Sequence, residues 1–354
     1  MSTITNSKLR VLVVDDSAYN RRSLSDILVS DPDIEVVGKA GDGDEALRLV
    51  TLLKPDAITL DLEMPRMDGF TFLRILMSVN PMPVIIVSSY SQKENVFKAL
   101  DLGALDFIAK PDRFADSELT RIRSELLQKI QIAKNMRPGA LPVRRATEAL
   151  AARTSAVSPG AVVVPRYVVA IASSTGGPTA LMEAFAKIPE RPRSTILIAQ
   201  HMPDKFTRTF AERLDRRSPM QVTEAQDGDI MTGGCGFVCP GRHCMEIDRP
   251  RPNEFRIKVS EPDASDRYVP SGDRLLTSVA KAAGPKSVGV ILTGMGDDGV
   301  QGAKSIIQAG GTVIAESAST AVVYGMPGAA VRAGVVTKSL PIHEIADWLA
   351  MLCS

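Results

Sequence analysis

The chain of 354 residues is poor in cysteine and in excess charge, and each shortage excludes a class of protein. Four cysteines are too few for a disulfide framework in a chain of this length. A net charge of +1 gives no general attraction to nucleic acid or to a membrane surface. No apolar run could cross a bilayer, and the first ten residues, MSTITNSKLR, lack the apolar core of a signal peptide. We therefore expect a cytoplasmic protein without a nucleic-acid partner and without membrane insertion.

The length suggests two domains, and the sequence contains two series of alternating strand and helix patterns. Residues 8–130 hold the first series, and residues 166–354 hold the second. Residues 131–165 between them are rich in Ala, Pro, Arg and Ser, which predicts a linker. Short buried-type strands that alternate with helices predict parallel α/β sheets covered on both faces. Within the second series, residues 222–260 are short, glycine-rich and weakly alternating, which predicts a β-hairpin insertion.

Polar residues follow four predicted strands of the first domain, at the point where each strand ends. They are Asp15 and Asp16, Asp61, Ser88, and Lys110. Because the carboxyl ends of parallel strands meet at one edge of a sheet, we expect these side chains to converge. Clustered carboxylates repel one another unless a cation joins them, and oxygen ligands suit Mg²⁺. Each residue taken alone could instead be a helix cap or a surface residue.

The first domain resembles the receiver domain of two-component response regulators. The matching stretches are VVDD (13–16), LDLEMPRMDG (60–69), VSS (87–89) and ALDFIAKP (104–111). The resemblance implies a flavodoxin-like fold in which a histidine kinase supplies the phosphoryl group that Asp61 accepts. It implies that Asp15, Asp16, Asp61 and the backbone carbonyl of Glu63 hold Mg²⁺. It further implies that Ser88 and Lys110 contact the phosphoryl group and that Phe107 is the aromatic residue that changes orientation between states.

In the second domain, the stretch VVAIASSTGGP (168–178) places three hydroxyl residues before two glycines. They could cradle a phosphate, cap a helix or include a nucleophile. The phosphate-loop patterns G-x-x-x-x-G-K-[ST] and G-x-G-x-x-G are absent from it. Ser174 or Thr175 precedes a predicted helix, and taken alone this position favours a capping role.

A nucleophile is favoured by the polar residues at the ends of other strands in the second domain. His201 comes directly after the strand STILIAQ, and Asp297 and Asp298 come after SVGVILTG. Serine, histidine and aspartate at one sheet edge match the logic of a catalytic triad. The chain order Ser-His-Asp and the missing G-x-S-x-G elbow disfavour an ordinary α/β-hydrolase. The alternative is a polar rim in which His201 is merely hydrogen-bonded.

The stretches IASSTGGP, AQHMP, CPGRHCMEI and LTGMGDDG resemble the catalytic domain of the chemotaxis receptor methylesterase family, CheB. In that family a receiver domain precedes a doubly wound parallel-sheet catalytic domain. The resemblance implies Ser174 as nucleophile, His201 as base and Asp298 as orienting carboxylate. It implies that Thr175 and the backbone around Met295 and Gly296 shape the site and bind the oxyanion. Asp297 stands where asparagine is common in the family and could compete for the orienting role.

The implied function is a phosphorylation-activated protein-glutamate methylesterase in chemotaxis adaptation. Its substrate would be a glutamate methyl ester on the cytoplasmic domain of a chemoreceptor, with protein-glutamine deamidation as a second activity. Mg²⁺ would serve phosphorylation, and the esterase reaction would need no cofactor. One alternative is a signalling regulator whose second domain has lost catalysis, and another is a transcription factor, for which no recognition helix is evident. A zinc site at Cys235, Cys239, His243 and Cys244 is disfavoured by its spacing.

Overall fold

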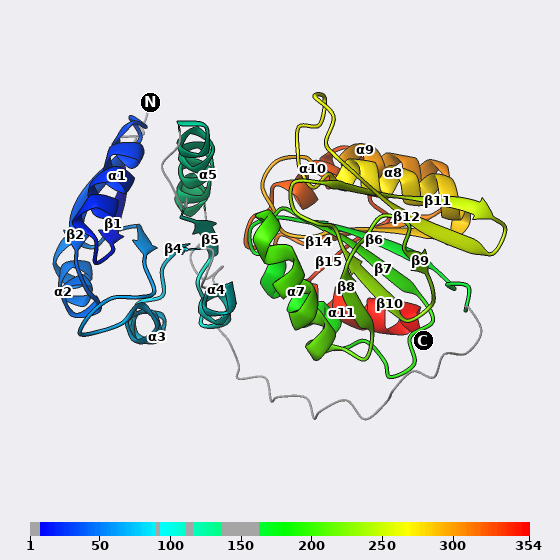
Figure 1. Ribbon diagram of the computed structural model, residues 1–354, viewed down its shortest axis with the longest axis horizontal. Helices are drawn as coiled ribbons and strands as arrows, with labels where there is room; N and C mark the ends of the chain where they lie inside the picture. The colour runs from blue at the N-terminus through cyan, green and yellow to red at the C-terminus, as the bar shows by residue number, and fades with distance from the viewer. Residues whose placement is uncertain (1–7, 90–92, 111–115, 136–162) are drawn as a thin grey trace, which may run out of the picture. The chain divides into compact units, whose positions relative to one another are not determined.

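The computed structural model describes residues 8–89, 93–110, 116–135 and 163–354 of the chain (Figure 1). The chain divides into two compact units, residues 1–146 and 147–354. Most of the predicted linker lies outside the described residues. Among the helices that are described, none is both long and apolar enough to span a bilayer.

The first unit is a five-stranded parallel sheet with the strand order β2-β1-β3-β4-β5. Its elements are β1 (Leu9–Val14), α1 (Ala18–Val29), β2 (Ile34–Ala40), α2 (Gly43–Leu53), β3 (Ala57–Leu60), α3 (Gly69–Val79), β4 (Val84–Ser88), α4 (Lys93–Asp101), β5 (Asp106–Ala109) and α5 (Asp116–Asn135). This is the flavodoxin-like order, so the predicted fold of this unit is confirmed.

Side-chain caps fix where three helices of the first unit begin. Ser17, Asp42 and Asp68 each accept a hydrogen bond from the backbone N–H three residues later. The turn from β1 into α1 is therefore set by Ser17. These short turns keep the residues after β1 and β3 at the carboxyl edge of the sheet.

Helix α5 continues to Asn135, past residue 131, where the sequence pattern places the start of the linker. Ile122, Leu126 and Ile130 are buried at intervals of four residues. This spacing is one apolar stripe of a helix, and the stripe packs on the core. The compositional change that predicts a linker therefore begins before the helix itself ends.

The second unit contains a seven-stranded sheet, all parallel, with the order β15-β14-β13-β6-β7-β10-β8. Its elements are β6 (Val168–Ser173), α6 (Gly177–Phe185), β7 (Thr195–Gln200), α7 (Asp204–Arg217), β8 (Gln221–Glu224), β9 (Ile230–Met231), β10 (Cys235–Val238), β11 (Cys244–Arg251), β12 (Glu254–Ser260), α8 (Gly272–Ala283), a 3₁₀ turn (Gly284–Lys286), β13 (Ser287–Ile291), α9 (Val300–Gln308), β14 (Thr312–Glu316), α10 (Met326–Arg332), β15 (Lys338–Leu340) and α11 (Ile342–Cys353).

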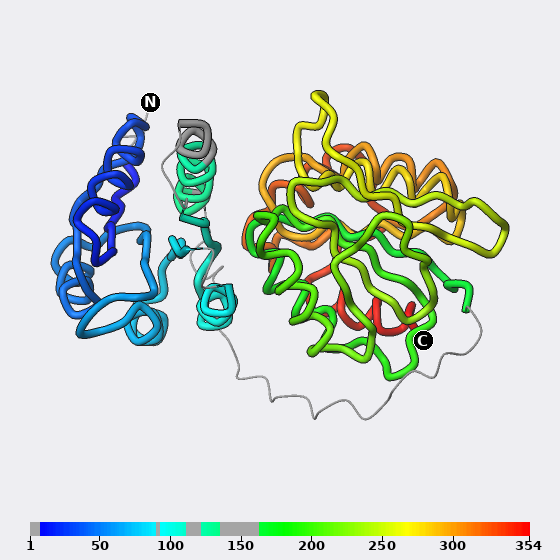
Figure 2. Tube along the Cα trace, viewed as in Figure 1, coloured from blue at the N-terminus to red at the C-terminus, as the bar shows by residue number. Residues whose placement is uncertain are grey.

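The predicted hairpin insertion is present as β11 and β12, which pair antiparallel and carry β9 at one edge. The short strands β8 and β10 come from the same region but are not part of the hairpin. They extend the parallel sheet beside β7. The path of the trace through this region can be followed in Figure 2.

The centre of the large sheet is its most buried part. Every residue of β6, β7 and β13 is buried, as their continuous apolar runs predict. Figure 1 shows α8 and α9 on one side of this sheet and α11 on the other. The chain leaves β6 toward β7 and later returns to β13 on the opposite side of β6. Such a switch in strand order opens a crevice at the carboxyl ends, where ligands bind in α/β sheets.

Candidate phosphorylation and active sites

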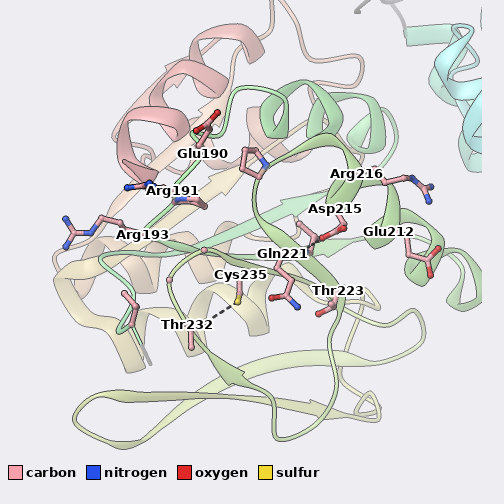
Figure 3. Close-up of a pocket in the computed structure, with 16 residues that line it drawn as sticks. Glu190, Arg191, Arg193, Glu212, Asp215, Arg216, Gln221, Thr223, Thr232 and Cys235 are labelled. Atoms are coloured by element: carbon pink, nitrogen blue, oxygen red, sulfur yellow. Dashed lines mark hydrogen bonds between the residues drawn. The ribbon is translucent and has the colours of Figure 1, made fainter. Parts of the chain in front are cut away.

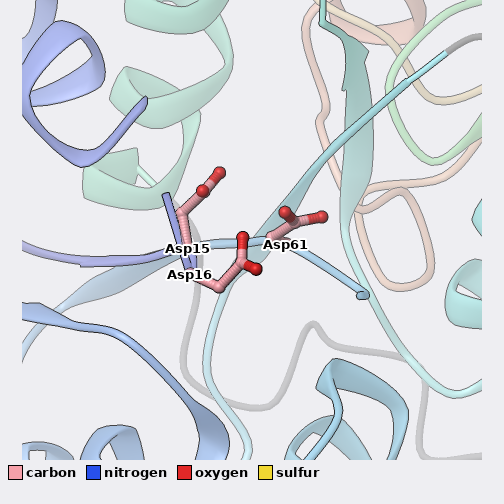
Figure 4. Close-up of side chains that lie close together, drawn as sticks. All are labelled: Asp15, Asp16 and Asp61. Atoms are coloured by element: carbon pink, nitrogen blue, oxygen red, sulfur yellow. The ribbon is translucent and has the colours of Figure 1, made fainter. Parts of the chain in front are cut away.

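Three carboxylates meet at the carboxyl edge of the first sheet (Figure 4). Oxygen atoms of Asp15, Asp16 and Asp61 all lie within 4.8 Å of one another. Asp15 and Asp61 are buried and follow the neighbouring strands β1 and β3, whereas Asp16 is exposed. The donor set consists of carboxylate oxygens close enough to share one ion, which fits Mg²⁺.

Lys110 closes this cluster from the end of β5. Its Nζ lies 2.6 Å from Asp61 Oδ2 and 2.8 Å from Asp15 Oδ2. Burial raises the pKa of Asp61, and the nearby Lys110 opposes that rise only in part. The pKa of Lys110 is raised, because its attraction to Asp61 and Asp15 outweighs the opposing effect of burial. The lysine thus supplies a fixed positive charge beside Asp61.

The remaining predicted residues of the first unit lie at the end of β4, in the loop after β3 and within β5. Ser88 is buried at the end of β4, and its carbonyl accepts a hydrogen bond from Lys110 N at 2.7 Å. Glu63 is exposed in the loop after Asp61. Phe107 is buried in β5, with its ring edge-on to Phe97 at 6.2 Å between centroids. The strand-end prediction therefore placed Asp15, Asp16, Asp61 and Lys110 together correctly.

The three hydroxyl residues after β6 have three different environments. Ser173 is fully buried, and its Oγ donates to Gln200 Oε1 at 2.7 Å. Thr175 is buried, and its carbonyl accepts from Thr293 Oγ1 at 2.9 Å. Ser174 between them is partly exposed. The capping interpretation is wrong, because the N-cap residue of α6 is Gly176 and no side chain caps the helix.

A tight turn presents Ser174 at the carboxyl edge of the large sheet. Its N–H donates to Thr293 O at 3.0 Å, and its carbonyl accepts from Gly177 N at 2.8 Å. Gln200 Nε2 donates to the same carbonyl at 2.9 Å and to His201 O at 3.0 Å. A Cβ at Gly177 would lie 2.1 Å from Gln200 Oε1, so only glycine fits beside this amide. The buried Gln200 side chain therefore links the ends of β6 and β7 through hydrogen bonds. The sequence pattern did not identify this residue, although it lies within the AQHMP motif.

His201 and Asp298 are joined by a hydrogen bond of 2.8 Å between Nε2 and Oδ2. Asp298 is 1% exposed and also accepts from the N–H groups of Gly272 and Asp273, at 2.7 and 2.9 Å. These two N–H groups open α8, so the positive end of the helix faces the carboxylate. Burial opposes ionisation of Asp298, but His201 and the two N–H groups outweigh it and lower the pKa of Asp298. The carboxylate therefore stays ionised beside the imidazole.

Ser174 and His201 occupy equivalent places at the ends of adjacent strands. Ser173 pairs with Gln200 in the sheet, and His201 N donates to Ser173 O at 2.9 Å. Among the hydrogen bonds of the described residues, none joins Ser174 Oγ to the imidazole in this conformation. Contacts of this kind often tighten only when substrate binds.

The neighbouring Asp297 binds other groups than the imidazole of His201. Its carboxylate accepts from Tyr268 Oη at 2.9 Å and from Arg267 Nη1 at 3.1 Å, away from the imidazole edge. The backbone N–H groups of Met295 and Gly296, which precede it, find no acceptor among the described residues. Both residues are partly exposed at the same edge as Ser174, and backbone N–H groups without an acceptor are the kind of donor that can stabilise an oxyanion.

Two other features of the second unit do not belong to this site. A hollow of about 850 Å³ is lined by Arg193, Gln221 and Cys235 among others, which begin or precede β7, β8 and β10 (Figure 3). It therefore lies at the amino ends of the strands, opposite Ser174. All four cysteines are free. Among the described residues, only the three aspartates bring three ligand atoms together, so the structure gives no support to zinc at Cys239 and His243.

Comparisons with known proteins agree with both halves of this description. Residues 11–122 match the model of the response regulator receiver domain, and residues 169–349 match that of CheB methylesterase. The chain is 47% identical over 345 residues to protein-glutamate methylesterase/protein-glutamine glutaminase 1 of Myxococcus xanthus, covering 97% of each. It is 44% identical over 363 residues to protein-glutamate methylesterase/protein-glutamine glutaminase 3 of Geobacter sulfurreducens, covering 98% of each. The crystal structure of the CheB methylesterase catalytic domain of Thermotoga maritima matches with a TM-score of 0.51 and 35% identity, covering 53% of this chain and 100% of that one.

Proposed function

The chain belongs to the CheB methylesterase family, and we propose that it hydrolyses glutamate methyl esters on the cytoplasmic domain of a chemoreceptor. The observation that carries the proposal is the arrangement of Ser174, His201 and Asp298 at the carboxyl edge of one sheet. Asp298 is ionised and holds the imidazole, and Ser174 is the only one of three adjacent hydroxyls that is partly exposed. A cytoplasmic location follows from that substrate.

In the first half of the reaction, Ser174 Oγ attacks the ester carbonyl carbon. Because Asp298 engages Nε2 of His201, the serine proton passes to Nδ1. This is the reverse of the assignment in chymotrypsin-like triads, where aspartate binds Nδ1. The N–H groups of Met295 and Gly296 stabilise the oxyanion, with Thr175 shaping the turn. The tetrahedral intermediate expels methoxide, which takes the proton from the imidazolium and leaves as methanol.

In the second half, His201 removes a proton from water, and the resulting hydroxide attacks the acyl carbon. The bond to Ser174 Oγ breaks, the serine regains its proton and a free glutamate is released. The same steps on a glutamine side chain expel ammonia in place of methanol. Protein-glutamine deamidation is therefore a second activity of the same site.

Phosphorylation of Asp61 controls the esterase. A histidine kinase supplies the phosphoryl group: the Asp61 carboxylate attacks phosphorus in line, the P–N bond to the kinase histidine breaks, and the kinase imidazole leaves. Asp15 and Asp16 would hold Mg²⁺ with Asp61 and the Glu63 carbonyl, and the ion when bound offsets charge on the phosphoryl group. Lys110 exchanges its ion pairs with Asp61 and Asp15 for the phosphoryl oxygens, which Ser88 also contacts. The phosphoryl group must bind one state of the protein better than another for this to activate the enzyme.

The proposal is tested by measuring methanol release from a methylated receptor cytoplasmic fragment. The wild type is compared with Asp61→Asn, each with and without Mg²⁺ and acetyl phosphate. Asp44→Asn serves as control, because Asp44 is exposed in α2, away from the cluster. We expect stimulation in the wild type and control, and only basal release in Asp61→Asn. No methanol from a wild type shown to be phosphorylated would instead support a regulator that has lost catalysis.

A further inference from the structure

A tyrosine lies flat against the imidazole of the catalytic histidine. The rings of Tyr268 and His201 are 9° from parallel, with centroids 5.3 Å apart. Tyr268 comes from the loop between β12 and α8, so it reaches His201 from a different segment than Asp298 does. Aspartate contacts the ring at its edge, whereas tyrosine stacks on it in an offset arrangement, as the 5.3 Å between the centroids of two near-parallel rings requires.

The phenol is itself held by groups on two sides. Its hydroxyl donates to Asp297 Oδ1 at 2.9 Å, and Arg267 Nη1 donates to the same carboxylate at 3.1 Å. The Arg267 guanidinium also lies over the Tyr268 ring, 5.2 Å from its centroid. Burial and the bond to Asp297 raise the pKa of Tyr268, so the hydroxyl stays protonated and remains a donor.

The turn that carries both aspartates is shaped around this phenol. Gly296 has a φ of +89°, and a Cβ there would lie 2.3 Å from Tyr268 Oη. Any other residue at this position would be strained and would displace the ring. Asp297 then reaches the phenol, and the next residue, Asp298, reaches the imidazole.

One hydrogen bond does not fix the plane of an imidazole, because the ring can still turn about the Nε2–Oδ2 line. A parallel ring on its face removes that freedom. The plane decides whether Nδ1 points at Ser174 Oγ, and a small error in such an angle is costly in rate. The aromatic face also attracts the imidazolium that forms when His201 takes the proton.

We propose that Tyr268 is a positioning residue that fixes the ring plane of His201, and that Asp297 acts by holding Tyr268. The kinetic consequence rests on the proposed esterase function. The geometric consequence, contact between the two rings, does not depend on any activity.

The kinetic test measures kcat and KM for methanol release by the full-length protein treated with acetyl phosphate. Tyr268→Leu removes the ring, and we expect kcat to fall about tenfold or more with KM unchanged. Tyr268→Phe keeps the ring and loses only the bond to Asp297, so it should lose less. Tyr167→Leu is the matched control, because Tyr167 also has an arginine over its ring, at 5.7 Å, but precedes β6 at the opposite edge of the sheet. A rise in KM alone for Tyr268→Leu would mean that Tyr268 contacts substrate, and would overturn the proposal.

The role of Asp297 is tested by combining substitutions. Asp297→Ala should lower kcat less than Tyr268→Leu does. In the double variant, Asp297→Ala should add nothing, because its target is already gone. If the two substitutions lowered kcat by factors that multiply in the double variant, Asp297 would act independently of Tyr268. The proposed role of Asp297 would then be wrong.

The activity-independent readout is the NMR signal of the His201 ring in protein with ¹³C-labelled histidine. The chain has three histidines, and His201→Gln identifies the signal. Tyr268 should shield the imidazole protons, so Tyr268→Leu should move the signal downfield, whereas Tyr268→Phe and Tyr167→Leu should not. An unchanged signal together with an unchanged kcat in Tyr268→Leu refutes the proposal. A shifted signal in a protein that releases no methanol would refute the esterase function and leave the ring contact standing.

Discussion

Replacing Glu316 by glutamine should flatten the pH dependence of the stability of the second unit. Glu316 ends β14 and is 1% exposed, and its carboxylate accepts from Thr293 N at 2.8 Å and from Thr320 Oγ1 at 2.9 Å. Burial raises the pKa of Glu316 from 4.5 to about 7, against these two hydrogen bonds. Thr293 O in turn accepts from Ser174 N, so this buried acid supports the turn that carries Ser174.

Whether the free energy of unfolding rises or falls with pH depends on which state, folded or unfolded, binds the Glu316 proton more tightly. Between pH 4.5 and about 7 the folded protein keeps the Glu316 proton, while the unfolded chain has lost it. The free energy of unfolding therefore falls as the pH rises through this window and loses no more above it. One pKa unit corresponds to about 1.4 kcal/mol, so the loss is about 3 kcal/mol. Glutamine does not titrate and should show none of this fall.

The assay is urea unfolding at a series of pH values, followed by tryptophan fluorescence. The chain has one tryptophan, Trp348, which lies in α11 and reports on the second unit alone. Relative to the wild type, Glu316→Gln should gain about 3 kcal/mol between about pH 4.5 and 7.5. Glu344→Gln, at an exposed glutamate of the same helix as the probe, should follow the wild-type curve. If the difference in the free energy of unfolding between Glu316→Gln and the wild type did not change with pH, the reasoning would be refuted.

Three further predictions concern the two sites. Asp298→Asn should lower kcat for methanol release by roughly 10³- to 10⁴-fold without unfolding the protein, because the imidazolium loses its counter-charge; a loss below tenfold would contradict the assigned role. Gln200→Leu should cost the second unit about 3 kcal/mol in urea unfolding, since Ser173 Oγ and two carbonyls lose their partner; an unchanged midpoint would contradict it. Removal of Mg²⁺ by EDTA should abolish stimulation by acetyl phosphate and leave basal methanol release intact, and loss of the basal rate would show that the esterase itself needs a metal.

The sequence allowed the fold class to be predicted because its central strands are continuous apolar runs of the right length. The rule that parallel strands share a carboxyl edge then brought Asp15, Asp61 and Lys110 together, and it placed Ser174 beside His201. The positions of the short strands β8 and β10 in the sheet could not be predicted, because alternation of apolar and polar residues indicates a strand but not the strand with which it pairs. The capping prediction for α6 was wrong because Gly176, with a φ of +79°, is the N-cap residue, and neither Ser174 nor Thr175 caps the helix with its side chain.

The supporting residues of the active site could not be predicted from the sequence. Gly272 and Asp273 bind Asp298 only because α8 begins beside it, and that depends on how a helix docks on the sheet. Tyr268 stacks on His201 although the two residues are far apart in the sequence, and helix or strand periodicity predicts only contacts between residues close in sequence. The roles of Ser174, His201 and Asp298 themselves stay predictions.

The central claim is that Ser174 is the nucleophile of a methylesterase, and methanol release by Ser174→Ala tests it most directly. The substrate is a methylated receptor cytoplasmic fragment, with Mg²⁺ and acetyl phosphate present. Ser339→Ala is the matched control, since Ser339 is exposed in the edge strand β15. The account predicts wild-type release from Ser339→Ala and none above the uncatalysed rate from Ser174→Ala. Release that survives in Ser174→Ala would contradict it.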